Sequence, residues 1–176
     1  MTEDPAPGNA HLATPIDSGR FREAMSRVAG AVHVVTTAGQ AGLGGITASS
    51  VTSITVEPPM MLFCINTTSP SAQRILDNRA FCINTLTAAD EHLSEIFAGR
   101  THQHLEERFT SGAWTKLATG APVLSTALAA FDCRLIEAKE VSTHLIVMGV
   151  VEAVAIASGG EALLYAHRKY RSLMLD

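Results

Sequence analysis

The feature that most constrains this chain is residues 44–59, which read GGITASSVTSITVEPP. Six hydroxyl-bearing residues alternate with Val, Ile and Ala, and Pro58-Pro59 ends the run. Val, Ile and Thr favour extended backbone, and proline cannot continue a hydrogen-bonded ladder. The stretch therefore predicts a strand pair or a bent strand with one apolar face and one face of hydroxyls and amides. That polar face suits a flat, acceptor-rich ligand, although a solvated edge strand of a barrel would carry the same residues.

The apolar content indicates more buried surface than a small monomer needs. The chain has 176 residues, which predicts one domain, and it is 47% hydrophobic but only 17% charged. No apolar run approaches the roughly 18 residues of a membrane span. We therefore expect a ligand pocket and a homodimer interface, with no membrane association. The net charge of −4 and the spread of basic residues along the chain indicate no nucleic-acid binding.

Cysteine usage and the N-terminus indicate a compartment. Cys64, Cys82 and Cys133 are odd in number and lie in apolar stretches, which is typical of buried thiols in a reducing environment. The acidic start lacks the apolar core of a signal peptide. We expect a cytoplasmic protein with a flexible segment at 1–16 and one domain at 17–176.

The order of helices and strands follows from periodicity and breakers. Helices are predicted from Asp17 or Ser18 to Gly30, from Ser69 to Asn78 and over 88–97, because apolar residues recur at helical spacing between caps. Strands are predicted over 32–37, 60–66, 127–138, 145–157 and 163–171. A glycine-rich hairpin connection at 39–45 joins the first strand to residues 44–59. Residues 60–66 are nearly all apolar, which predicts a strand buried on both faces.

An internal echo suggests two neighbouring strands. The sequence Phe-Cys-Ile-Asn-Thr occurs at 63–67 and again at 81–85. The segment between the copies is long enough for a helical crossover, so we interpret them as adjacent parallel strands. Short strands with few helices predict a mainly β protein, an antiparallel barrel with helices at its flanks.

The chain lacks the usual signatures of several enzyme classes. It has no glycine motif of a Rossmann fold or phosphate loop, no nucleophile beside a base, and no Cys or His set with metal-ligand spacing. His102 and His104 cannot share a helix face, so their polar segment is interpreted as a solvated turn. Chemistry by a bound organic cofactor is the class that remains.

An ordered set of motifs resembles the short-chain flavin reductases. The set covers about residues 18–173 and comprises Phe21 to Ser26, Val34 to Thr37, Thr47 to Ser50, Ser53, Pro58-Pro59, Asn66, Ser69, Phe81 to Leu86, Phe97 to Gly99, Arg108-Phe109, Thr143-His144, Gly149 and Tyr170. The resemblance implies an FMN-binding split β-barrel with a Greek-key-like course. It also implies a homodimer with FMN or FAD near the subunit interface and NADH, or NADPH, as co-substrate.

The resemblance further implies roles for individual residues. Thr47, Ala48, Ser49 and Ser50 would contact the isoalloxazine edge, with donors that stabilise the charge gained on reduction. Ser69 and Ser71 would hold the phosphate at a helix start, although a plain helix cap explains them too. The remaining residues implied to border the ring or ribityl chain are Asn66, Thr67, Asn84 and Leu86.

His144 would face the nicotinamide as the catalytic residue. The family usually has Gly-Asp-His there, whereas this chain has Ser142-Thr143-His144. The histidine is kept and a carboxylate is lost, and a lone histidine beside a strand can also be structural. His167, Arg168 and Tyr170 would close the pocket or meet the nucleotide, or else belong to a plain C-terminal strand.

The predicted function is an NAD(P)H:flavin oxidoreductase that supplies reduced flavin, by diffusion, to a partner flavin-dependent monooxygenase, an aromatic or phenol hydroxylase. The alternative is a flavin-binding or flavin-sensing barrel without turnover. A barrel oxidase acting on pyridoxine phosphate would also fit the fold, but it should carry a dense Arg/Lys cluster on the barrel.

Overall fold

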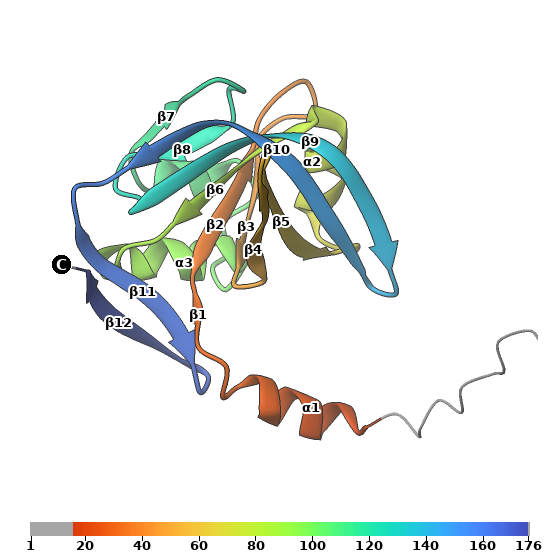
Figure 1. The fold of residues 1–176 in the computed structure, drawn as a ribbon, viewed down its shortest axis with the longest axis vertical. Coiled ribbons are helices and arrows are strands. Elements are labelled where there is room, and N and C mark those ends of the chain that lie inside the picture. The colour runs from red at the N-terminus through yellow and green to blue at the C-terminus, as the bar shows by residue number, and fades with distance from the viewer. Residues whose placement is uncertain (1–15, 176) are drawn as a thin grey trace, which may run out of the picture.

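The computed structural model describes residues 16–175, so nearly all of the expected flexible segment at 1–16 lies outside the described residues. One seven-stranded sheet dominates (Figure 1), with strand order β3-β2-β6-β9-β10-β5-β4. Every pair in it is antiparallel. Its strands are β2 (His33–Thr37), β3 (Gly44–Ala48), β4 (Val51–Val56), β5 (Pro59–Asn66), β6 (Ala80–Thr85), β9 (Ala129–Val141) and β10 (His144–Ile156).

The two edge strands of this sheet are consecutive in the chain. Only Ser49 and Ser50 separate β3 from β4, yet these strands lie at opposite ends of the strand order. The sheet therefore curls until its edges meet at Ser49-Ser50, without a hydrogen-bonded ladder that closes it. The expected mainly β split barrel is confirmed, and residues 44–59 form two strands as predicted.

Smaller sheets and helices surround the barrel. The strands β1 (Gly30–Ala31), β11 (Gly160–Ala166) and β12 (Lys169–Leu175) form a three-stranded sheet, and β7 (Trp114–Lys116) pairs with β8 (Pro122–Leu124). The helices are α1 (Ser18–Met25), α2 (Pro70–Asn78) and α3 (Glu91–Phe97), with short 3-10 turns η1 (Ala88–Asp90) and η2 (Glu107–Thr110). Asp17 caps α1 and Ser69 caps α2, as the sequence predicts. No helix within residues 16–175 is long and apolar enough to cross a membrane.

Alternation along β2 separates two apolar cores. Val34 packs into a cluster with Leu86, Leu93 and Phe97 under α3, whereas Val35 faces a second cluster inside the barrel. In the second cluster the Phe63 and Phe81 rings meet edge to face, with centroids 5.1 Å apart. Gly149 leaves room for Phe81, because a Cβ there would lie 2.6 Å from its ring.

The structure corrects the interpretation of the Phe-Cys-Ile-Asn-Thr echo. β5 and β6 are not neighbours, since β9 and β10 lie between them, and no parallel pair occurs among the described strands of this sheet. Helix α2 connects strands that face each other across the barrel, so the two copies meet through Phe63 and Phe81. The repeated sequence does not indicate adjacency. Its Phe and Ile are buried in both copies, but Asn66 is exposed whereas Asn84 is fully buried.

Two further expectations also differ. β5 fully buries only alternate residues, Met61, Phe63 and Ile65, whereas Met60, Leu62 and Cys64 on its other face are only partly buried. Residues 163–171 are not one strand but parts of the β11–β12 hairpin. The chain reverses at His167 and Arg168, which both have positive φ angles, of 53° and 60°.

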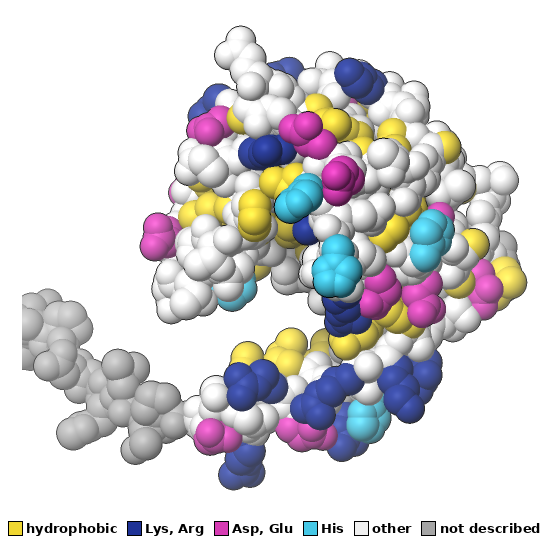
Figure 2. Space-filling model, turned by 180° about the vertical axis from the view of Figure 1, so that it is seen from behind, with side chains coloured by type: hydrophobic (Ala, Val, Ile, Leu, Met, Phe, Trp, Pro, Cys, Tyr) yellow, Lys and Arg dark blue, Asp and Glu magenta, His cyan; other side chains and the backbone are white. Residues whose placement is uncertain are grey.

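Helix α1 lies apart from the barrel, next to β1 and the β11–β12 turn (Figure 1). It buries none of its residues within the chain. Its contacts include an ion pair from Arg168 to Glu23, 3.0 Å long, and a hydrogen bond from the His167 amide to the Ser26 carbonyl. Figure 2 shows this part of the molecule from behind, with hydrophobic side chains on the side that faces the gap below the barrel.

Candidate functional site

A cleft of about 470 Å³ lies where the two sheet edges meet. The connection between β3 and β4 forms one wall, the ends of β5 and β10 form another, and the start of α2 together with η2 closes the side. Its polar lining comes from five separate parts of the chain, namely Thr47, Ser49 and Ser50, Asn66, Ser69, Arg108 and His144.

The β3–β4 connection presents free polar groups to this cleft. The last residue pair of the β2–β3 ladder is His33 with Ala48, so Ser49 lies beyond the paired part of β3. Ser50 is tied to β5, because its carbonyl accepts from the Cys64 amide at 3.1 Å and its hydroxyl donates to the Cys64 carbonyl at 3.3 Å. Ser49 is exposed, and no partner for its amide or hydroxyl occurs within residues 16–175. Its donors are therefore available to a ligand.

Thr47 has a different role from Ser49. Its hydroxyl donates to the Ser94 carbonyl at 2.6 Å, which ties β3 to α3. The Ser94 hydroxyl in turn shares a 2.8 Å hydrogen bond with the Tyr170 phenol. Thr47 therefore lines the cleft, but its hydroxyl proton is already donated to Ser94 and is not available to a ligand.

Asn66 and His144 form one end of the cleft. They are paired residues of the β5–β10 ladder. The Asn66 side-chain oxygen accepts from the Thr68 amide at 2.9 Å, which fixes the orientation of the side chain. His144 is exposed, and its Nδ1 lies 2.9 Å from the Thr143 hydroxyl. The Nε2 edge of the ring remains free to meet a ligand.

Arg108 is the cation of the cleft, and it is not among the site residues predicted from the sequence. Its guanidinium makes two long hydrogen bonds to carbonyls, at 3.4 Å to Gly45 and 3.5 Å to Gln103. No carboxylate within residues 16–175 forms an ion pair with it. Burial lowers the pKa of Arg108, since part of its hydration is lost without a compensating charge. An anion placed here would restore that compensation.

The start of α2 lies beside Arg108 on the same cleft. Ser69 and Pro70 line it, and the Ser69 hydroxyl accepts from the Ser71 amide at 3.4 Å. The positive end of the helix dipole and the Arg108 charge act on the same volume. This end of the cleft is therefore suited to a phosphate, whereas the Ser49 end offers neutral donors.

Comparison with known proteins identifies the family. Residues 25–174 match the model of the flavin reductase like domain. The chain belongs to this family. It is 50% identical to FMN reductase (NADH) RutF 2 of Methylorubrum extorquens (strain PA1), over 90% of this chain and 91% of the relative.

Two solved structures share the fold. BorF, the flavin reductase component of a bacterial two-component tryptophan halogenase, is 30% identical, with a TM-score of 0.84 over 91% of this chain and 100% of BorF. A homologue of nitrilotriacetate monooxygenase component B from Mycobacterium thermoresistibile is 25% identical, with a TM-score of 0.82 over 90% of this chain and 87% of that chain.

The flavin reductase fold brings many of the predicted site residues together. Thr47, Ala48, Ser49, Ser50, Asn66, Ser69 and His144 all line the cleft. Tyr170 lies in an adjoining cavity of about 180 Å³, which Thr47, Ala48 and Ser49 also line. Tyr165 and Arg100 share that cavity with it.

Other residues predicted for the site do not line this cleft. Ser71, Asn84 and Leu86 are fully buried. The Asn84 amide nitrogen donates to the Val34 carbonyl at 3.0 Å, and its oxygen accepts from the Leu124 amide at 2.8 Å. These contacts hold β2, β6 and β8 together, so Asn84 is a core residue.

Thr67, His167 and Arg168 are exposed but outside the main cleft. The Thr67 hydroxyl donates to the Thr143 carbonyl at 3.2 Å and so joins the ends of β5 and β10. His167 and Arg168 form the β11–β12 turn beside α1. In the polar segment with His102 and His104, as in the rest of residues 16–175, no group of three metal-ligating side chains forms.

Arg108 could have been found from the sequence by one signal. It belongs to the family match as Arg108-Phe109, and it is an arginine in a segment otherwise rich in His and Glu. The residues Phe97 to Gly99, which line the cleft as well, belong to the same set of motifs, whereas Cys64 carries no such signal.

Proposed function

We propose that this protein is an NADH-dependent FMN reductase. The observation that supports it best is the two-ended cleft at the β3–β4 connection. Ser49 offers neutral donors at one end, and at the other Arg108, which has no ion pair within residues 16–175, lies beside a helix start. A flavin mononucleotide has the matching polarity, with an acceptor-rich ring at one end and a phosphate at the other. Family membership and the FMN reductase relative support the same choice.

Bound flavin would supply a ring that accepts hydride from NADH, and the chain would bind and orient both molecules. The Ser49 and Ser50 amides and hydroxyls would donate to the ring edge and stabilise the negative charge that reduction adds. Ser69 and Arg108 would hold the phosphate. No side chain needs to act as a strong acid or base in this scheme.

His144 would orient the nicotinamide. It stands at the rim of the cleft with Nε2 free, opposite Asn66, and it is too exposed to contribute to the core. Thr143 replaces the carboxylate that the family usually has at this place, so Nδ1 contacts a neutral hydroxyl. We infer a positioning role for the ring that does not depend on an acidic partner.

We further propose a homodimer that covers α1. Phe21, Met25 and Val28 lie on one face of the N-terminal segment and are 56%, 49% and 59% exposed. An isolated helix of eight residues is not stable in water, so a second surface must cover this face. A groove of about 400 Å³ between α1 and the barrel includes Ser49 and Ser50, which would place the subunit interface next to the flavin.

The reduced flavin would leave for a flavin-dependent oxygenase in the cytoplasm. By its name BorF belongs to a two-component tryptophan halogenase, and the other solved structure is a homologue of component B of nitrilotriacetate monooxygenase. Tryptophan and nitrilotriacetate are not one chemical kind, so we propose a monooxygenase partner, with an aromatic hydroxylase as one instance. The three cysteines are free thiols, as a reducing compartment requires.

The test is NADH oxidation by the purified chain with FMN, FAD or riboflavin added. We expect turnover that saturates with FMN and is faster with NADH than with NADPH. Tight flavin binding without oxidation of either nucleotide would contradict the reductase and support a flavin-binding module.

A further inference from the structure

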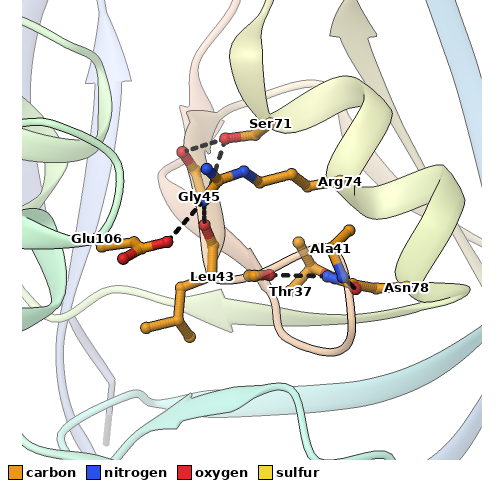
Figure 3. A network of polar contacts seen from close by, with 9 residues as sticks. Thr37, Ala41, Leu43, Gly45, Ser71, Arg74, Asn78 and Glu106 are labelled. Atoms are coloured by element: carbon orange, nitrogen blue, oxygen red, sulfur yellow. Dashed lines mark hydrogen bonds and ion pairs between the residues drawn. The ribbon is translucent and has the colours of Figure 1, made fainter.

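Ser71 is a fully buried polar residue whose hydroxyl makes both of its cross-element hydrogen bonds to a single residue, Gly45. The hydroxyl accepts from the Gly45 amide and donates to the Gly45 carbonyl, each at 3.0 Å. Figure 3 shows the Ser71 side chain pointing from α2 onto the β3 backbone. A ligand in the cleft cannot reach this hydroxyl.

The position of β3 explains why Gly45 needs such a partner. β3 is an edge strand, paired only with β2, where Gly45 lies opposite Thr36. The outward amide and carbonyl of an edge strand have no neighbouring strand to bond. One Ser71 hydroxyl takes the place of that missing strand, because it donates and accepts at once.

Gly45 is also held from its other side. A Cβ at this position would lie 2.6 Å from the Phe97 ring and 3.3 Å from the Val35 carbonyl, so Phe97 packs directly on the backbone. Phe97 therefore contacts one face of the strand at Gly45, and Ser71 bonds its outer edge. The direction of the Gly45 carbonyl depends on both contacts.

The same carbonyl accepts a hydrogen bond from Arg108. The Nη1 atom of Arg108 lies 3.4 Å from the Gly45 oxygen, which thus has Ser71 and Arg108 as two donors. Arg108 has only one other hydrogen bond within residues 16–175, to the Gln103 carbonyl at 3.5 Å. The orientation of the guanidinium over the cleft therefore depends strongly on where the Gly45 carbonyl points.

We propose that Ser71 is a positioning residue for the phosphate end of the cleft, acting through the Gly45 carbonyl on Arg108. This inference rests on the proposed function, in which Arg108 holds the flavin phosphate. Without the Ser71 hydroxyl, the outward Gly45 amide has no partner and the Gly45 carbonyl keeps only Arg108 as a donor, so the carbonyl no longer holds Arg108 in one direction. Recognition of the phosphate is then lost while the ring end of the cleft stays intact.

Helix α2 offers a matched control at its other end. Asn78 accepts from the Ala41 amide at 2.9 Å and donates to the Gly42 carbonyl at 2.9 Å and to Thr37 at 3.1 Å. It fastens the same hairpin to the same helix (Figure 3) but touches neither Gly45 nor Arg108. Replacement of Asn78 therefore tests the effect of a lost contact between helix and hairpin, without a change at Gly45 or Arg108.

The experiment compares the affinities of FMN and riboflavin, which differ only by the phosphate. Wild type should bind FMN at least about tenfold more tightly, the factor of one charge-assisted hydrogen bond. Arg108→Gln should lower this ratio the most, to what Ser69 and the start of α2 support alone, and Ser71→Ala should reduce it to within about threefold. Asn78→Ala should keep the wild-type ratio, even if its melting temperature falls as much as that of Ser71→Ala. Riboflavin affinity serves as an internal reference for the folded fraction.

A double variant separates positioning from general damage. In the Arg108→Gln background, Ser71→Ala should change the ratio no further, because both act on one interaction. If Ser71→Ala does not fold, Ser71→Cys fills nearly the same space with a poor donor and should lower the ratio in the same direction.

Two results would overturn the inference. A wild-type ratio in the foldable Ser71 variant, with the ratio lowered in Arg108→Gln, would make Ser71 purely structural and leave the proposed function standing. Failure of the wild-type chain to bind either flavin would instead remove the proposed function, and this inference with it.

Discussion

Asn66 and His144 are cross-strand partners, one at the end of β5 and the other at the start of β10, and both side chains border the same cleft. Their strands are adjacent in the sheet although nearly eighty positions separate the residues in the chain. The pairing gives His144 a defined place relative to the β3–β4 connection, which is what a group that orients a substrate requires.

Replacement of His144 by Ala should affect hydride transfer selectively. The ring is exposed and contributes little to the core, so flavin affinity and the melting temperature should stay close to wild type. We expect kcat/KM for NADH to fall about tenfold, which corresponds to about 1.4 kcal/mol of transition-state stabilisation. His92→Ala, an exposed histidine on α3 outside the cleft, is the control. An unfolded His144 variant would show that the residue is structural.

Replacement of Gly149 by Ala should destabilise the barrel. A Cβ there would lie 2.6 Å from the Phe81 ring and 2.8 Å from the Arg134 carbonyl, and the backbone oxygen cannot move aside. Overpacking of this kind costs about 1–3 kcal/mol in the free energy of unfolding. Thermal or urea unfolding measures it. Gly30→Ala is the matched control, because its nearest atoms lie 3.7 Å away, and equal losses in both variants would refute the packing argument.

Stability should fall in mild acid because of His33. Burial between β3 and β6 lowers the pKa of His33 from 6.5 to about 4, and its Nδ1 lies 3.1 Å from the Thr85 hydroxyl. Between these two pH values the unfolded chain binds a proton that the folded chain does not. The contribution is therefore fully present above pH 6.5 and is lost as pH falls toward 4, by at most about 3 kcal/mol.

The pH dependence can be assigned with His33→Gln, which removes the titrating group and keeps a side chain able to bond Thr85. The free energy of unfolding of this variant should change less between pH 7 and pH 5 than that of the wild type. Identical slopes in the two proteins would mean that other groups cause the acid sensitivity.

Loss of the apolar face of α1 should disrupt the proposed dimer. Phe21→Ser with Met25→Ser removes two large exposed apolar side chains, and we expect light scattering to show a monomer at micromolar concentration. Arg20→Ala, on the polar side of the same helix, should remain dimeric. A wild-type chain that is monomeric at this concentration would contradict the homodimer itself.

Local features could be predicted from the sequence because their causes are local. Residues 44–59 form strands, α2 begins at Ser69-Pro70, and the 127–157 region forms a long hairpin, since propensity, caps and turn residues act over a few positions. The ordered motifs likewise identified the family, and with it most of the residues that line one wall of the cleft.

Only the tertiary structure decided which strands pair and which polar residues face the ligand. β5 and β6 both contain Phe-Cys-Ile-Asn and yet lie across the barrel from each other, because strand pairing depends on the arrangement of the whole sheet. Ser69 and Ser71 look equivalent in the sequence, but Ser69 is the extended N-cap of α2 and lines the cleft, whereas Ser71 lies in the first turn of the helix and is buried against Gly45. Arg108 became a site residue because burial without a carboxylate partner is a property of its surroundings, and those surroundings come from segments distant in the chain.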